Sequence, residues 1–264
     1  MSGASPTEQE LLAVAHAAAQ AAASELVARF GAEPDGLRSK STPTDPVSAA
    51  DLAAEEAIRR VLARERPGDA ILGEEGGETV AAASSDGLRW VVDPLDGTVN
   101  YLHRIPQFAV SIACEDADGT IVGVVLSPVT GETFAATRSG PATLNDETIA
   151  GSDCDSLSMA LVGTGFAYSP EVRAAQGNVL QRLLPLVADI RRPGAAALDL
   201  CICACGRIDA YYERSIKAWD IAAGSLICRR AGLEVRRLES SGILPPGVLA
   251  ASPALIDVLL ELVG

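Results

Sequence analysis

One stretch decides how the chain is interpreted: Trp90-Val91-Val92-Asp93-Pro94-Leu95-Asp96-Gly97-Thr98. Its apolar start predicts a strand that is buried on both faces. Because Pro94 cannot donate to a sheet ladder, we expect the strand to end there, with Asp93 and Asp96 on a tight turn at its carboxyl end. Two carboxylates held this close repel each other unless a cation lies between them. The stretch therefore fits either a metal site or an ordinary acidic turn closed by Asp-Gly.

Composition limits the classes of partner. The chain has 264 residues, enough for one large domain or for two small domains that share an interface. Apolar residues make up 48% and aromatic residues only 4%, so the core must consist mainly of Ala, Val, Leu and Ile. The net charge of −14 predicts repulsion from nucleic acid and from anionic membranes. An anionic substrate would need a local cation.

The sequence predicts a cytoplasmic protein. The N-terminus lacks the basic region of a secretory signal, and we expect no apolar run of the roughly 18 residues that a membrane span needs. The six cysteines lack the spacing of a disulfide framework and are interpreted as reduced, buried small residues. Cys201, Cys203 and Cys205 could suggest a metal site, but the C-x-x-C spacing is absent, which favours packing.

The first part of the chain predicts an α+β half over residues 1–150. Capping boxes open expected helices over 7–30 and 48–66, with a polar loop over 35–46 between them. A short strand over 69–73 leads into an acidic turn. Strands over 108–114 and 120–126 around Asp118-Gly119 form an expected hairpin, and a third strand covers 133–137. Two helices followed by grouped strands predict an antiparallel-rich sheet backed by helices.

The second part predicts an α/β half over residues 151–264, with the boundary near 139–157. Strands and helices alternate here, which favours this class. The expected strands cover 160–163, 208–212 and 233–238, and the expected helices cover 170–187, 195–205, 218–231 and 254–263.

Acidic residues carry the chemistry that the sequence supports. The two histidines, His16 and His103, allow no confident Ser-His-Asp or Cys-His arrangement and no zinc site, although His103 could help to shape the acidic site. Four acids lie beside expected strand ends or helix starts: Glu74, Asp93, Asp96 and Asp220. Carboxylate oxygens without nitrogen or sulfur suit Mg²⁺ or Mn²⁺. Two such ions can activate a water and stabilise a leaving oxygen, which would suit a phosphate ester.

The chain resembles the inositol monophosphatase family, a group of lithium-sensitive, metal-dependent phosphatases. The order and the separations of the shared motifs fit the family, and the likeness extends over most of residues 37–235. The matching stretches are Asp93-Pro94-Leu95-Asp96-Gly97-Thr98, Trp219-Asp220-Ile221-Ala222-Ala223-Gly224, Gly73-Glu74-Glu75, and the segment from Lys40-Ser41 to Asp51. This resemblance implies a layered αβαβα sandwich, and residues 163–166 and 191–195 are most similar to the bacterial inositol-1-monophosphatase branch.

The resemblance also implies the metal ligands and the catalytic pair. Two or three Mg²⁺ ions, for which Mn²⁺ could substitute, would be held by four carboxylates and one backbone carbonyl, from Glu74, Asp93, Leu95, Asp96 and Asp220. Asp51 and Thr98 would orient and deprotonate the attacking water.

The resemblance further implies which residues bind substrate. Gly97 and Thr98 would offer backbone N–H groups to the phosphate at a helix N-terminus. Residues 194–196 would contact the substrate through their backbone, and Glu213 would accept hydrogen bonds from polyol hydroxyls. The full set implied for substrate binding is Asp96, Gly97, Thr98, Gly194, Ala195, Ala196, Glu213 and Asp220.

Several of these residues have simpler explanations. Asp51 fits a first-turn acid of its helix, Glu213 beside Arg214 fits a surface ion pair, and Lys40 fits an ordinary loop lysine. Ala195 stands where relatives often carry a hydroxylic residue, which removes one side-chain contact with substrate.

Three hypotheses for function follow. The first is a Mg²⁺-dependent phosphomonoesterase that hydrolyses inositol 1-phosphate, without nucleic-acid or membrane partners and, as the resemblance implies, as a homodimer. The second keeps this chemistry for fructose 1,6-bisphosphate, histidinol phosphate or 3′-phosphoadenosine phosphate. The third is a non-catalytic regulator that retains the fold. The complete set of acids argues against the third, because clustered acids are costly to keep folded without metal.

Overall fold

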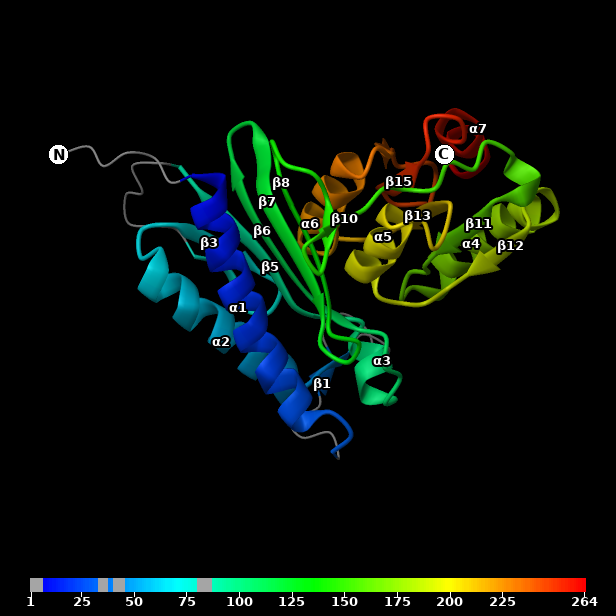
Figure 1. The fold of residues 1–264 in the computed structure, drawn as a ribbon. Coiled ribbons are helices and arrows are strands. Elements are labelled where there is room, and N and C mark those ends of the chain that lie inside the picture. The colour runs from blue at the N-terminus through cyan, green and yellow to red at the C-terminus, as the bar shows by residue number, and fades with distance from the viewer. Residues whose placement is uncertain (1–6, 33–37, 40–45, 80–86) are drawn as a thin grey trace.

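The computed structural model describes residues 7–32, 38–39, 46–79 and 87–264. Helices and sheets alternate in five layers, from the helix pair α1 (Glu8–Arg29) and α2 (Ala49–Glu65) to the helix pair α4 (Pro170–Leu183) and α7 (Ile256–Val263) (Figure 1). The predicted mixed α/β fold is confirmed. The division into halves at residues 139–157 stays a prediction.

The first sheet is antiparallel-rich, as expected. Its strands follow the order β10-β9-β8-β7-β6-β5-β3-β4, and only the pair β3 and β5 is parallel. The strands are β3 (Ala70–Gly73), β4 (Gly77–Thr79), β5 (Arg89–Asp96), β6 (Ala109–Asp116), β7 (Gly119–Ser127), β8 (Glu132–Thr137), β9 (Thr143–Leu144) and β10 (Glu147–Thr148). The predicted hairpin is formed by β6 and β7.

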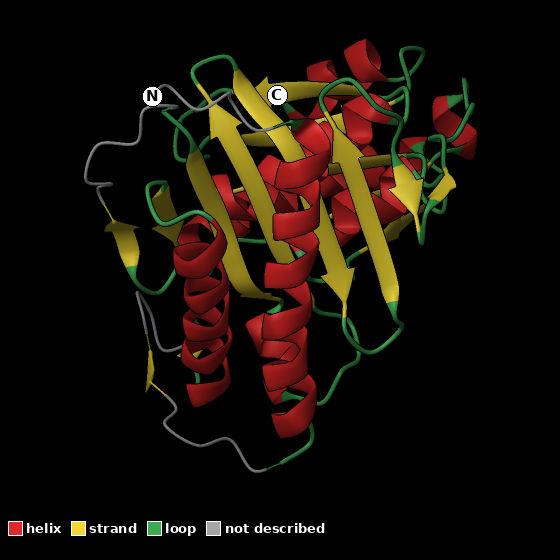
Figure 2. Cartoon of the chain, turned by 60° about the vertical axis from the view of Figure 1, so that its left-hand side comes forward, coloured by secondary structure: helices red, strands yellow, loops and turns green. Residues whose placement is uncertain are grey.

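Two helices, α1 (Glu8–Arg29) and α2 (Ala49–Glu65), cover one face of this sheet (Figure 2). Both begin with the predicted capping boxes, Thr7 with Glu10 and Ser48 with Asp51. One 18-residue window of α1 has a mean hydropathy of 1.4, which by length and composition alone would suffice for a membrane span. The buried residues of α1 pack instead in the core against the sheet, as those of a core helix do.

Strand β5 corrects the prediction that the strand ends at Pro94. It continues to Asp96 through an irregularity: Asp93 pairs with Ser111 and Asp96 with Ala109, so three residue steps on β5 face two on β6. A proline is tolerated in a sheet at such a bulge, where a ladder donor is not required. The bulge leaves both acidic residues on the strand itself.

The second sheet is mixed. Its order is β12-β11-β13-β15-β14, with parallel pairs on the β12 side and antiparallel pairs around β15. The strands are β11 (Leu161–Thr164), β12 (Asp189–Arg191), β13 (Ala210–Arg214), β14 (Glu234–Leu238) and β15 (Gly247–Ala251). The sequence did not predict β15, although it lies between two other strands.

Helices pack on both faces of the second sheet. These are α4 (Pro170–Leu183), α5 (Ala196–Ala204), α6 (Ala218–Arg230) and α7 (Ile256–Val263). The helix expected over 170–187 ends earlier, and a 3₁₀ turn (Leu184–Leu186) follows, because Pro185 cannot donate the next helical hydrogen bond. The remaining short elements are β1 (Arg38–Ser39), β2 (Pro46–Val47), α3 (Thr98–Leu102) and a 3₁₀ turn (Leu157–Met159).

The apolar residues of β5 point alternately to two cores. Trp90 and Val92 pack with α1 and α2, whereas Val91 packs with α5 and α6. A third core lies between the second sheet and α4 and α7. The six cysteines are free, and most are buried, as predicted.

Candidate active site

The carboxyl end of β5 places two acids beside a short helix. Asp93 is 2% exposed, and its Oδ1 accepts a hydrogen bond from the Leu95 N–H at 2.9 Å. Gly97 has a φ of +90°, which a residue with a side chain rarely adopts, and a Cβ there would lie 3.0 Å from the Gln107 carbonyl oxygen. This glycine lets the chain turn directly from Asp96 into α3.

Thr98 and Asp51 are in contact, as the sequence analysis expected. The Thr98 hydroxyl lies 3.1 Å from Asp51 Oδ1 and 3.1 Å from the Leu95 carbonyl oxygen, so it can donate to either. Asp51 is fully buried, and its Oδ2 accepts from the Ser48 N–H at 2.8 Å and from the Ser48 hydroxyl at 2.6 Å. Asp51 is therefore both a helix cap and the partner of Thr98.

Asp96 connects the first sheet to α5. Its carboxylate accepts hydrogen bonds from the N–H groups of Ala196 at 3.0 Å and Ala197 at 2.7 Å, at the start of α5. Ala195 at the N-cap has no side-chain acceptor, so Asp96 satisfies amides that the local sequence leaves without one. The predicted substrate loop and a predicted metal ligand are thus joined directly.

The remaining two acids approach the same region. Glu74 follows β3, and its N–H donates to the Val92 carbonyl at 3.3 Å, next to Asp93. Asp220 lies in the first turn of α6 and accepts from the Lys217 N–H at 2.6 Å. Four acids from two elements, β5 and α6, and from the turn after β3 therefore lie close to one another.

Three of these acids, Asp93, Asp96 and Asp220, have raised pKa values, and burial is the largest cause. Burial raises the pKa of Asp93 well above its usual value, and the charges of Glu74, Asp96 and Asp220 raise it further. Burial also raises the pKa of Asp96 to about 7 and that of Asp220 to about 8. Each carboxylate thus disfavours the charge of its neighbours, and a cation would relieve that repulsion.

The donor set fits a hard divalent cation, because it consists of carboxylate oxygens and the Leu95 carbonyl. Among the residues that the structure describes, no group of three His, Cys, Asp or Glu side chains is already arranged to hold an ion. That the predicted ligands hold metal stays a prediction.

Glu213 lies on the second sheet and faces the same region. The Tyr211 hydroxyl donates to its carboxylate, and a Cβ at Gly165 would overlap with it. Burial raises the pKa of Glu213 to about 7, while the nearby Arg192 charge lowers it. Glu213 is thus not a surface partner of Arg214, which donates to the backbone carbonyls of Glu239 and Pro245.

Sequence reasoning missed a group of residues that holds the loop before α5. The Asn100 side chain donates to the carbonyls of Gln107 at 2.7 Å and Pro193 at 2.9 Å. The buried Asp199 carboxylate accepts from the Gly194 N–H at 3.2 Å. An acid in the first turn of α5 was the available signal, because such a residue commonly binds the amides just before a helix.

Two further residues were named in the sequence analysis. His103 is exposed at the end of α3, which does not support a role in shaping the site. Lys40 falls outside the described residues, so the expectation for it stays a prediction.

The model of the inositol monophosphatase family matches residues 7–263, which is nearly the whole chain. The chain belongs to the inositol monophosphatase family. Members of this family are metal-dependent phosphatases. The protein is therefore a phosphatase, as expected from the sequence.

Named relatives of this inositol monophosphatase family member cover most of its length. Inositol-1-monophosphatase SuhB of Mycobacterium tuberculosis is 44% identical over 244 residues, 89% of this chain and 83% of the relative. Nus factor SuhB of Pasteurella multocida is 36% identical over 254 residues, 95% of this chain and 94% of the relative. The crystal structure of the extragenic suppressor protein SuhB from Bartonella henselae has a TM-score of 0.88 and 35% identity, covering 96% of this chain and 98% of that one.

Proposed function

We propose that this phosphatase is a Mg²⁺-dependent phosphomonoesterase that hydrolyses inositol 1-phosphate to myo-inositol and phosphate. The observation that carries the proposal is the group of four mutually repelling acids beside the Asp51–Thr98 hydrogen bond. Relatives that are 44–47% identical bear the name inositol-1-monophosphatase, which supports the choice of substrate.

The residues of the chain prepare the attacking water. Bound Mg²⁺ would polarise the water and the ester oxygens. Thr98 would accept a hydrogen bond from the water while its own hydroxyl donates to Asp51 Oδ1. The water proton would then reach Asp51 through the hydroxyl, while the Ser48 hydrogen bonds hold the other carboxylate oxygen in place. This arrangement needs no histidine and no covalent intermediate.

The second sheet would bind the alcohol part of the substrate. Glu213 lies where it can accept hydrogen bonds from a polyol, and Tyr211 fixes its orientation. The backbone of residues 194–196 would contact the substrate, and the N–H groups of Gly97 and Thr98 would contact the phosphate. Fructose 1,6-bisphosphate, histidinol phosphate and 3′-phosphoadenosine phosphate remain the alternative substrates.

The other finer expectations belong to the same proposal. We propose two or three Mg²⁺ ions with Mn²⁺ as a substitute, inhibition by Li⁺, a homodimer and a cytoplasmic location. The net charge of −14 supports the absence of nucleic-acid and membrane partners.

A regulatory role is the second candidate, because relatives such as that of Pasteurella multocida bear the name Nus factor SuhB. The closely grouped acids support catalysis instead, since an acidic cluster is costly to fold unless it serves a purpose. A stable protein partner without turnover on any phosphate ester would reverse this ranking.

The decisive measurement is phosphate release from the four candidate substrates with and without Mg²⁺. Inositol 1-phosphate should give the highest kcat/KM. The substitutions Asp93→Asn and Asp220→Asn should each lower kcat/KM by about 100-fold or more, because losing a metal ligand should cost at least as much as losing its supporting contacts. Asp118→Asn, at an exposed hairpin turn, is the matched control and should have no effect. Full activity in the presence of a strong chelator would refute the proposal.

A further inference from the structure

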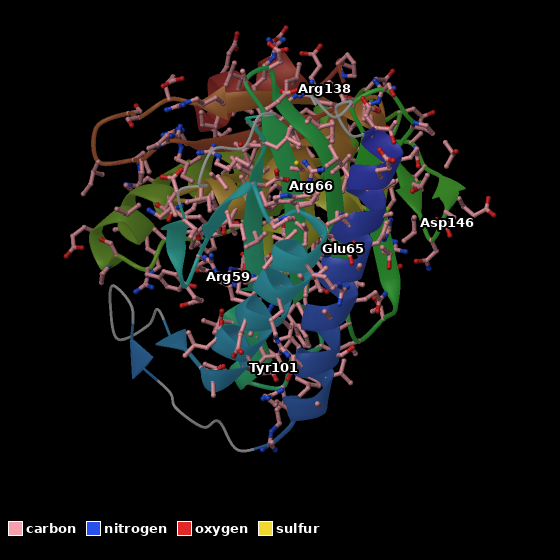
Figure 3. All side chains as sticks on the ribbon, turned by 90° about the vertical axis from the view of Figure 1, so that its left-hand side faces the viewer. Arg59, Glu65, Arg66, Tyr101, Arg138 and Asp146 are labelled. Atoms are coloured by element: carbon pink, nitrogen blue, oxygen red, sulfur yellow. The ribbon has the colours of Figure 1, made fainter. Side chains whose placement is uncertain are left out.

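Two residues of α2, a buried glutamate and a partly buried arginine, form an ion pair outside the proposed ligand set. Arg59 Nε donates to Glu55 Oε1 at 2.7 Å, and Glu55 is only 3% exposed. Figure 3 labels Arg59 on α2. A pair four residues apart on a surface helix is usually solvated and worth little, whereas a buried one needs further hydrogen bonds to offset its desolvation.

The Glu55 carboxylate finds those hydrogen bonds in the turn between β3 and β4. Its Oε2 accepts from the Glu75 N–H at 2.8 Å, and its Oε1 accepts from the Gly76 N–H at 2.8 Å. Both oxygens thus bind consecutive amides of one turn. Charge-assisted hydrogen bonds of this kind are roughly twice as strong as neutral ones.

Arg59 binds the strand that follows the same turn. Its Nη1 donates to the Thr79 hydroxyl at 2.6 Å, and its Nη2 donates to the Gly77 carbonyl at 3.0 Å. Together the two side chains contact the turn and both ends of β4. We call them the α2 clamp.

Two glycines make this contact possible. A Cβ at Gly73 would lie 2.7 Å from Glu55 Oε1, and a Cβ at Gly76 would lie 2.6 Å from both Glu55 Oε1 and Arg59 Nη2. Any larger residue at either position would push the α2 clamp away. The close fit therefore depends on residues on both sides of the contact.

The turn that the clamp holds begins with Glu74. Gly73 pairs with Val92 in the parallel ladder between β3 and β5, and the Glu74 N–H donates to the Val92 carbonyl. The pairing of β3 with β5 therefore fixes the backbone just before Glu74 and holds Glu74 beside Asp93. On its other side, the chain is fixed by Glu55.

We propose that the α2 clamp positions Glu74 against Asp93 and thereby sets the affinity of the site for a divalent metal ion. This inference rests on the proposed function, which makes Glu74 a metal ligand. Asp51 lies one helical turn before Glu55, so a single helix aligns both the proposed water-orienting pair and the turn that carries Glu74. Glu55 and Arg59 are positioning residues, since neither is in the proposed ligand set.

The test measures Mg²⁺ binding to the metal-free protein by calorimetry, without substrate, and Mg²⁺ activation of turnover. Glu55→Gln removes the charge but keeps the shape, and Arg59→Met removes the guanidinium. Each should weaken Mg²⁺ binding by about 10-fold or more, the usual cost of removing a contact that orients a metal ligand. At saturating Mg²⁺ the KM for substrate should be unchanged. Glu56→Gln, an exposed neighbour on α2, is the control and should bind Mg²⁺ as the unchanged protein does.

A purely structural clamp gives a different result. Glu55→Gln and Arg59→Met would then lower the melting temperature while leaving the Mg²⁺ dissociation constant within twofold of the control, which would overturn the proposal. If Glu55→Gln does not fold, Gly76→Ala replaces it, because that change keeps both charged groups and only displaces them. Weakened Mg²⁺ binding supports the proposal, and unchanged binding overturns it.

The test of the α2 clamp can succeed or fail independently of the test of the proposed function. Mg²⁺-dependent turnover of inositol 1-phosphate by the unchanged protein tests the function alone. A protein that binds Mg²⁺ without such turnover, and loses binding in Glu55→Gln, would refute the function but support the clamp.

Discussion

Asp51 fits both interpretations that the sequence offered, a first-turn acid of its helix and the partner of Thr98. Its Oδ2 closes the capping box with Ser48, while its Oδ1 faces the Thr98 hydroxyl. The cap holds the carboxylate still, and a fixed acceptor is what a proton relay needs.

Removal of the Thr98 hydroxyl tests that relay. Thr98→Val keeps the shape of the side chain but leaves the water without its oriented acceptor, so kcat should fall by about 100-fold or more. The melting temperature should change little, because the remaining Ser48 hydrogen bonds still hold Asp51.

Thr98→Ser is the matched control for the relay and should retain most of the activity, since it keeps the hydroxyl. Steady-state kinetics at saturating Mg²⁺ distinguish the two variants. Similar kcat values for Thr98→Val and Thr98→Ser would show that the hydroxyl has no part in the reaction.

The sequence allowed much of the site to be predicted, because strand ends and capping boxes are local signals. The contact between Asp96 and α5 was not predicted, since its two sides are 100 residues apart and only folding brings them together. The sequence did contain one local signal. The N-cap of α5 is Ala195 and its first residue is Ala196, and neither has a side chain that can accept a hydrogen bond from the first N–H groups of the helix.

At the scale of elements, α6 packs closely against the first sheet and also against α5. A Cβ at Gly123 of β7 would lie 2.8 Å from the Cα of Ala223, and a Cβ at Gly224 would lie 2.8 Å from the Cβ of Leu200. The two nearest atoms that a Cβ at Gly123 would meet belong to the backbone of Ala223, so the clash could be relieved only by moving a helix or a strand. The position of α6 matters because it carries Asp220.

Gly123→Ala should therefore destabilise the protein by about 1–3 kcal/mol through overpacking. Gly177→Ala is the opposite case, because Gly177 is exposed in the middle of α4 and has nothing within 4 Å of an added Cβ. That change should stabilise by about 0.5–1 kcal/mol, the usual gain in a helix. Chemical denaturation measures both, and equal effects of the two changes would contradict the tight packing of α6.

The fold could be predicted where the periodic pattern and the turn residues agree, as in α1, α2 and the β6–β7 hairpin. Strand β15 was missed because it directly follows Pro245-Pro246, which suggest an irregular segment. Its neighbours β13 and β14 supply the pairing that makes it a strand. The extension of β5 past Pro94 was missed for a similar reason, since a bulge depends on the partner strand.

At the scale of the whole molecule, metal binding should stabilise the fold. A ligand that binds only the folded state adds about 2.7 kcal/mol at a concentration 100 times its dissociation constant. We expect Mg²⁺ to raise the melting temperature and a chelator to reverse the rise, because the ion offsets the repulsion among the buried acids.

The matched comparison is Asp93→Asn. This variant should gain less melting temperature from Mg²⁺ than the unchanged protein, since one ligand and one repelling charge are both removed. An equal gain in both proteins would place the bound ion elsewhere.

The alternation of β5 between two cores has a consequence for changes in chain length. Trp90 and Val92 face one core and Val91 faces the other, so an inserted or deleted residue upstream of Asp93 would exchange the sides of these three. It would also shift Asp93 and Asp96 relative to β6. Variants of this enzyme can therefore differ in residue type along β5 but not in spacing, and length changes should be tolerated at exposed turns such as that at Asp118 instead.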